Sequence, residues 1–132
     1  MTTLTQEMKD MIATQQCFVG TVNEDGTPNV APKRSTRVLS DNSLLFTEGT
    51  GGATYRNLKR GSKVSVSIVN REILDGYRFA GHAELQESGD LYEQAAAMSA
   101  KMGLPKPYAV AIIHIDEIHS LKPGPGAGKI IA

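Results

Sequence analysis

The first sixteen residues carry apolar side chains at the spacing of one face of an α-helix. These apolar residues are Leu4, Met8, Met11 and Ile12. They stand at positions i, i+4, i+7 and i+8, the period of an amphipathic helix. Thr3 and Gln6 are placed as a possible capping box at its start. The pattern predicts a short helix that ends near Gln16.

Beyond residue 16 the pattern changes to β-branched runs and to alternation of apolar with polar residues. The alternation is clearest over residues 63–70, where one face is apolar and the other carries small polar side chains. Asp25 and Gly26 favour a tight turn between two strands, and Gly81 favours a bulge. We expect six strands, over residues 17–23, 28–39, 43–47, 63–70, 77–87 and 108–118.

Helical spacing returns twice after the first helix. Residues 53–60 follow a run of glycines and predict one short helix. Residues 90–102 predict a longer helix, capped by Asp90 with Glu93 and stopped by Gly103. Its expected buried stripe is Leu91, Ala95, Met98 and Met102. Six strands with short helices and mostly local turns favour a mainly β fold, a mostly antiparallel β-barrel, over a doubly wound parallel sheet.

The last expected strand is apolar on both of its faces. One face holds Ala111, Ile113 and Ile115, and the other holds Val110 and Ile112. A chain of 132 residues can bury one hydrophobic core but not a large ligand cavity as well. We therefore expect one face of this strand to pack against a second copy of the chain, with any wide cofactor site between the subunits.

Composition narrows the classes of partner. Lysine plus arginine and aspartate plus glutamate both number 14, so no global basic field attracts nucleic acid or anionic lipid. A single cysteine, Cys17, suits a reducing compartment. No apolar run approaches the roughly 20 residues of a membrane span, and the N-terminus lacks a secretory pattern. We expect a cytoplasmic protein with a small-molecule partner.

The C-terminal residues differ in composition from the rest of the chain. We expect one domain over residues 1–122 and a Gly/Pro-rich tail over residues 123–132. The tail is similar to a phosphate-binding loop, but Pro123 replaces its first glycine and Ile130 replaces the hydroxyl residue that would hold Mg²⁺. It is therefore interpreted as a flexible or extended arm, which could cross to a partner subunit.

The loop Gly49-Thr50-Gly51-Gly52 is the most informative local feature. Glycines let backbone N–H groups approach an anion at a helix N-terminus, where the helix dipole also favours negative charge. Thr54 adds a hydroxyl donor. A dinucleotide-binding fingerprint would need a third glycine where Thr54 stands, and the parallel βαβ context is missing. A plain connecting turn explains the loop equally well.

Lys33 and Arg34 form an unusually basic stretch within an expected strand. Consecutive residues of a strand face opposite sides, so the two cations need different roles. One can face solvent while the other points at a ligand phosphate or at the electron-rich edge of a ring. The alternative is a charged edge strand that discourages aggregation.

No residue is identified as catalytic. His82, His114 and His119 have none of the spacings of known metal sites, so no metal is expected. Cys17 lies in an apolar strand and is interpreted as an inert core residue. The chain has no Gly-x-Ser-x-Gly elbow and no evident pair of catalytic carboxylates. If the protein is an enzyme, its chemistry belongs to a cofactor.

Taken in order, the first helix, the Asp-Gly hairpin and three sequence segments resemble the FMN-binding split-barrel family of pyridoxamine 5′-phosphate oxidase-like proteins. The segments are Pro28-Asn29-Val30-Ala31-Pro32-Lys33-Arg34, Leu44-Leu45-Phe46-Thr47-Glu48-Gly49 and Ala53-Thr54-Tyr55-Arg56-Asn57-Leu58. The match covers nearly the whole chain in element order. The resemblance implies a six-stranded, mostly antiparallel split barrel that works as a homodimer and binds FMN.

The resemblance also implies roles for particular residues. The strand matching residues 32–35 lines the flavin, and the strand end at Phe46 and Thr47 touches its ring. The loop and helix start matching residues 52–57 hold the phosphate. The expected cofactor-binding residues are Pro32, Lys33, Arg34, Ser35, Phe46, Thr47, Gly49, Gly52, Ala53, Thr54 and Asn57.

The chain departs from the family pattern at two places. Many members have a lysine or arginine where this chain has Ala53, so the phosphate must be met by backbone N–H groups, Thr54 and a basic residue from elsewhere. The candidates for that basic residue are Lys33, Arg34 and Arg56. True pyridoxamine 5′-phosphate oxidases also carry a C-terminal Arg-x-His motif, but the last arginine here is Arg78. Oxidation of vitamin B6 is therefore not expected.

Three hypotheses about function follow from the resemblance. The first is an FMN-dependent oxidoreductase with two flavins at the dimer interface and a small molecule or a protein as electron donor and acceptor. The second is a non-enzymatic FMN carrier or electron-transfer protein. The third is a flavin-free barrel that binds another small ligand or serves as a structural dimer.

Overall fold

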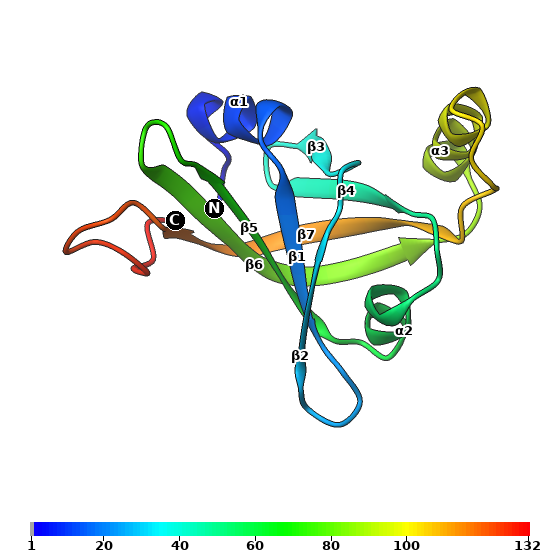
Figure 1. The fold of residues 1–132 in the computed structure, drawn as a ribbon, viewed down its shortest axis with the longest axis horizontal. Helices are drawn as coiled ribbons and strands as arrows, with labels where there is room; N and C mark the ends of the chain where they lie inside the picture. The colour runs from blue at the N-terminus through cyan, green and yellow to red at the C-terminus, as the bar shows by residue number, and fades with distance from the viewer. Residues whose placement is uncertain (1) are drawn as a thin grey trace.

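The computed structural model describes residues 2–132 as one antiparallel sheet of seven strands with three helices (Figure 1). The strands are β1 (Cys17–Val22), β2 (Pro28–Pro32), β3 (Arg37–Ser40), β4 (Ser43–Glu48), β5 (Lys63–Asn70), β6 (Asp75–Gln86) and β7 (Ala109–Ser120). The helices are α1 (Gln6–Thr14), α2 (Ala53–Lys59) and α3 (Asp90–Lys101). The strand order β2-β1-β5-β6-β7-β4-β3 confirms the mainly β, antiparallel prediction.

The sheet has seven strands rather than the predicted six because residues 28–39 do not form a single strand. After Pro32 the chain turns, and the N–H of Thr36 donates to the carbonyl of Lys33 at 3.1 Å. Residues 33–37 are all polar, so no alternation continues the strand. β2 and β3 therefore lie at opposite ends of the strand order, and the turn at 33–36 carries the chain from one edge of the curled sheet to the other.

The main core lies inside the curled sheet. Its largest fully buried side chains include Phe46, Phe79, Leu44, Ile68, Ile113 and Ile118. α1 lies over one end of the sheet, and the four apolar residues that the spacing predicted are all buried, three of them on α1 and Leu4 just before it (Figure 1). Its capping box uses Thr5 and Met8 rather than Thr3 and Gln6, because the helix begins later than predicted. The Asp25-Gly26 turn and the bulge at Gly81 are confirmed.

α3 covers the second face of β7 (Figure 1). Val110 and Ile112 pack with Tyr92 and Ala95 of α3, so the face predicted to meet a second copy is covered within the chain. The predicted stripe of α3 is correct at Ala95, which is buried, but wrong at Met98 and Met102, which are exposed. The helix buries Tyr92 and Ser99 in their place.

The rotation of α3 follows from Tyr92. Its ring fills the space over β7, and its hydroxyl donates to the carbonyl of Pro107 at 2.7 Å.

The residue before the helix, Gly89, is the N-cap in place of Asp90. α3 is the longest helix at 12 residues, and among residues 2–132 no helix has the length and apolar character needed to cross a membrane.

The C-terminal tail turns back onto its own chain. The N–H of Ile131 donates to the carbonyl of Ile118 at 2.8 Å, and the N–H of Ser120 donates to the carbonyl of Lys129 at 2.9 Å. β4 pairs only with residues 109–114 of β7. The tail therefore lies along the later part of the β7 edge, instead of extending as the free arm that its composition predicted.

Candidate functional site

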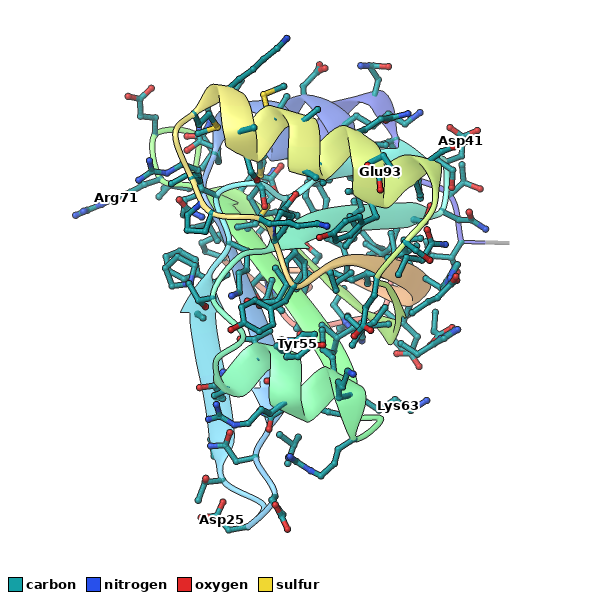
Figure 2. All side chains as sticks on the ribbon, turned by 90° about the vertical axis from the view of Figure 1, so that its right-hand side faces the viewer. Asp25, Asp41, Tyr55, Lys63, Arg71 and Glu93 are labelled. Carbon is teal, nitrogen blue, oxygen red and sulfur yellow. The ribbon has the colours of Figure 1, made fainter. Side chains whose placement is uncertain are left out.

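The candidate site forms where the turn at 33–36, the end of β4, the glycine loop at 49–52 and the start of α2 meet. The chain passes directly from β4 through the loop into α2, because the glycines allow the sharp change of direction. Figure 2 shows α2 beside the β1–β2 hairpin, with Asp25 at the hairpin tip and Tyr55 on the side of α2 toward the rest of the molecule. The loop connects two groups of predicted residues.

The first group surrounds the end of β4, and the second lies at the start of α2. The first comprises Pro32, Lys33, Arg34, Ser35, Phe46 and Thr47, and the second comprises Gly52, Ala53, Thr54 and Asn57, with Gly49 in the loop between them. Pro32 and Arg34 are exposed at the turn, whereas Phe46 is fully buried. Phe46 therefore belongs to the core beneath the first group, and its ring packs against Lys33.

The side chain of Glu48 accepts hydrogen bonds from both the turn at 33–36 and the loop at 49–52. This last residue of β4 is fully buried, and its Oε1 accepts a 2.9 Å bond from the Lys33 Nζ. Its Oε2 accepts bonds of 3.1 Å from the N–H groups of Thr50 and Gly51, and one of 3.3 Å from the Thr50 hydroxyl. Burial alone would raise the pKa of the carboxyl, but Lys33 and the two N–H groups together hold it below its ordinary value.

Two contacts fix the turn against β4. The Ser35 hydroxyl accepts from the N–H of Thr47 at 2.9 Å and donates to the Thr47 carbonyl at 3.4 Å. The Lys33 Nζ lies 5.6 Å from the centroid of the Phe46 ring. Lys33 is therefore held between a carboxylate and an aromatic face, close to the end of β4.

Thr54 and Asn57 connect α2 to the β1–β2 hairpin. Both are buried, at 3% and 2% exposure. The Thr54 hydroxyl accepts from the Asn29 amide at 3.3 Å, and as a hydroxyl it has a hydrogen of its own to donate. The Asn57 amide donates to the Thr21 hydroxyl and to the Asn23 side-chain oxygen, each at 2.9 Å.

An open cavity of about 450 Å³ lies beside this junction. It is lined by Asn23, Glu24, Asp25, Ala53, Arg56, Asn57 and Arg60. Arg56 and Ala53 border the same cavity. Arg60 donates to the Asn57 side-chain oxygen at 2.7 Å. The cavity thus combines two guanidinium groups, one on α2 and one directly after it, with two carboxylates from the hairpin tip.

Tyr108, just before β7, packs on the opposite side of the loop. Gly51 has φ +67°, and a Cβ at this position would lie 2.7 Å from the ring of Tyr108. The Tyr108 and Tyr55 rings meet edge to face, with centroids 5.4 Å apart. The loop is therefore held between the Glu48 carboxylate and an aromatic pair. The positive φ favours glycine at position 51, and a larger residue there would also displace the Tyr108 ring.

Sequence reasoning missed Glu48 and Tyr108. An acidic residue at the end of an apolar strand and directly before a glycine loop is a usable signal for Glu48, but its partner Lys33 is fifteen residues earlier and belongs to another part of the sheet. The N–H of Gly51, which was expected to meet a ligand anion, donates to Glu48 instead. Only the later part of the loop remains for that role.

The three histidines lie outside the candidate site. His82 is on β6, and His114 and His119 are on β7. His82 and His114 stack with centroids 5.2 Å apart, and each lies 3.1 Å from a carboxylate, of Asp116 and Glu84 respectively. Within residues 2–132 no group of three or more histidine, cysteine, aspartate or glutamate side chains is arranged to hold a metal ion. Cys17 is buried, and burial raises its thiol pKa to about 11, as expected for an inert core residue.

The sequence profile of pyridoxamine 5′-phosphate oxidase matches residues 4–122, nearly the whole chain. The chain belongs to this family. An uncharacterized protein of Methanocaldococcus jannaschii is 33% identical to this chain over 133 residues, which are 98% of this chain and 88% of that protein.

Solved structures of other proteins share this fold. The crystal structure of HupZ from Group A Streptococcus is 43% identical with a TM-score of 0.83, covering 95% of this chain and 99% of that one. An FMN-binding protein from Syntrophomonas wolfei has a TM-score of 0.73 at 16% identity, covering 88% of this chain and 84% of that one. At that identity the likeness shows the fold alone.

Proposed function

We propose that this chain binds FMN between two subunits and that the flavin serves as the redox cofactor of an oxidoreductase. The observation that carries the proposal is the single glycine loop that connects a cationic strand-end group, around Lys33, to a polar helix start, around Thr54. These two groups match the two ends of a flavin mononucleotide, a planar ring and a phosphate. The fold likeness to the FMN-binding protein of S. wolfei supports the same reading.

The residues at the two ends of the loop fit the two chemically different ends of FMN. At the ring end, Lys33, Ser35 and Thr47 supply polar groups, with Pro32 and Arg34 exposed beside them. At the phosphate end, the Gly52–Asn57 segment supplies backbone N–H groups and the Thr54 hydroxyl. Bound flavin supplies transfer of hydride or of single electrons, and the residues named here would orient it and set its electrostatic surroundings.

Arg56 is our candidate for the cation that many family members carry at position 53. Lys33 is already paired with Glu48, so it is not available to neutralise a phosphate. Arg56 is exposed and borders the same cavity as Ala53. A guanidinium suits a phosphate because it can donate two parallel hydrogen bonds.

The proposed dimer uses the outer face of β2, β1 and β5. Cross-strand pairing puts Phe18 and Val30 on one face together with three small residues, Gly20 beside them on β1 and Ser65 and Ser67 on β5. Phe18 is 44% exposed and Val30 is 66% exposed. A sheet face with exposed apolar side chains is a surface that a second copy can cover.

Pro32 links this face to the candidate site. It pairs with Phe18 and directly precedes Lys33. A second subunit on the face would therefore border the ring end of the site, which is where a chain of this size needs help to enclose a flavin.

The decisive experiment is identification of the chromophore. The purified protein should be yellow, and mass spectrometry of the released compound should give FMN. A colourless protein that fails to take up added FMN would overturn the proposal. Anaerobic bleaching by NADH or NADPH, with turnover on an acceptor, is expected for the oxidoreductase; reduction only by a protein partner would instead indicate an electron carrier.

A further inference from the structure

Among the acidic side chains of residues 2–132, the carboxylate of Glu48 stands out because it is fully buried and is surrounded by hydrogen-bond donors. The four donors are the Lys33 ammonium, the Thr50 N–H, the Thr50 hydroxyl and the Gly51 N–H. Lys33 itself has a side-chain exposure of 16%. An ion pair this deep is seldom kept for stability alone, since desolvation offsets much of the attraction.

We propose that Glu48 is a positioning residue of the flavin site, whose carboxylate fixes both the Lys33 ammonium and the glycine loop for flavin binding. The inference rests on the proposed function. Glu48 contributes no group to the ligand; it acts through Lys33 at the ring end and through the Thr50 and Gly51 amides at the start of the loop. One side chain thereby sets the relative position of the two ends of the site.

Only a carboxylate satisfies this arrangement. Glutamine has the same shape, but its NH₂ group is a donor and would face either Lys33 or the loop amides, which are donors too. Glutamate presents two accepting oxygens, one to each side. The Glu48→Gln change therefore breaks one half of the arrangement whichever way the amide turns.

Lys33 is the charged group that faces the carboxylate from the turn at 33–36. From β7, Ala109 pairs across the strand with Glu48, and the Tyr108 N–H donates to the Glu48 carbonyl at 2.8 Å. The loop contributes Thr50 and Gly51. Titration of Glu48 is therefore governed by one cation and two amides, and removal of Lys33 should make the carboxylate easier to protonate.

The first test needs no flavin. In NMR spectra of the apoprotein, the amide protons of Thr50 and Gly51 should shift together with one midpoint as the pH is lowered. Glu48→Gln should abolish that common transition, and Lys33→Met should move it to higher pH. Amides that do not titrate together, or a midpoint unchanged in Lys33→Met, would overturn the proposal.

The second test measures flavin affinity by fluorescence quenching. Glu48→Gln should weaken FMN roughly ten- to a hundredfold, and it should weaken riboflavin by a smaller factor, because Lys33 serves both ligands whereas the loop leads to the phosphate end that only FMN uses. Lys33→Met should weaken both as well, and it carries this test if Glu48→Gln does not fold. The matched control is Glu84→Gln, which changes an exposed carboxylate on β6 and should leave both affinities unchanged.

The outcomes separate the two proposals. Unchanged flavin affinity in both Glu48→Gln and Lys33→Met would overturn the positioning role while leaving FMN binding intact. Failure of the unsubstituted protein to bind any flavin would overturn the proposed function and, with it, a role of Glu48 toward flavin. The amide titration would then still report whether the carboxylate fixes the loop.

Discussion

At the scale of single residues, the polar side chains of α2 have a structural and a proposed binding role at once. Thr54 and Asn57 are buried polar groups, and buried polar groups need hydrogen-bond partners. Both find them on the β1–β2 hairpin. A change at either position therefore alters the attachment of α2 as well as any ligand held at its start, and an experiment must separate these effects.

Thr54→Val tests the phosphate end. If the Thr54 hydroxyl donates to the phosphate, the change removes a hydrogen bond to a charged group, which costs about 1.5–3 kcal/mol, or roughly ten- to a hundredfold in FMN affinity. Riboflavin lacks the phosphate and should bind as before. Thr54→Ser, which keeps the hydroxyl, is the control. Equal weakening of FMN and riboflavin would show that the phosphate lies elsewhere.

Gly51→Ala tests the loop that holds the site together. Its φ of +67° is costly for alanine, by roughly 1–2 kcal/mol, and the added methyl would overlap the Tyr108 ring. We expect a lower Tm and weaker flavin binding. Gly126→Ala is the control, because its Cβ would meet nothing within 4 Å.

A double variant separates the two causes at position 51. Adding Tyr108→Ala to Gly51→Ala removes the overlap but not the backbone strain. The loss in the free energy of unfolding should then be smaller than the sum of the two single losses. Strict additivity in thermal or chemical unfolding would mean that the ring does not restrict position 51.

At this scale the structure brings some of the predicted site residues together. Ser35 contacts Thr47, and Thr54 stands at the start of a short helix, while their role toward a ligand stays a prediction. Glu48 could not be recognised, because its significance depends on burial and on a partner from a different region of the sheet. Tyr108 was missed for the same reason, since only the fold brings it onto Gly51.

At the scale of elements, hydrophobic spacing predicted α1 and most strands, because each depends on a local pattern and a local turn. The exception is the polar segment 33–37, which was read as the middle of one strand. Propensity alone does not reveal that the chain there crosses from one sheet edge to the other. The orientation of α3 was also missed, because Tyr92 rather than Met98 fills the space over β7.

The C-terminal tail is the element whose removal is most informative. Truncation after Leu121 deletes the backbone bonds that residues 128–132 make to Ile118 and Ser120. Water can replace these at an edge, so each contributes only about 0.5–1.5 kcal/mol. We expect the truncated barrel to remain folded by circular dichroism, with a lower Tm.

The side chains of the tail provide the control for the truncation. Ile131 is 52% exposed, and Ile131→Ser keeps the backbone bonds to β7. This variant should therefore unfold at the same temperature as the unsubstituted protein. Loss of the soluble fold on truncation would show instead that the tail is part of the barrel.

At the scale of the whole molecule, the structure relocates the surface that a partner subunit would cover. Both faces of β7 are already covered over residues 109–113, by the core on one side and by α3 on the other. The sequence pattern could not reveal this, because an apolar strand face looks the same whether a helix or a subunit covers it. The exposed apolar face of β2, β1 and β5 remains, and it adjoins the proposed ring end of the flavin site.

Val30→Asp tests that surface. Val30 is the most exposed of the apolar residues on this face, at 66%, so the change should not disturb the core of the subunit. In a symmetric dimer it would place two carboxylates in one apolar interface, and each would have to be desolvated at a cost on the order of several kcal/mol. The mass in solution should therefore fall to that of a monomer, and bound flavin should be lost because half of its enclosure is gone.

Met98→Asp is the matched control: Met98 is also apolar and 57% exposed, but it lies on α3. That variant should stay dimeric and yellow, as measured by light scattering and absorbance. If Val30→Asp remains a flavin-bound dimer while Met98→Asp dissociates, the subunits meet through α3, and the flavin site must be completed from that side of the molecule.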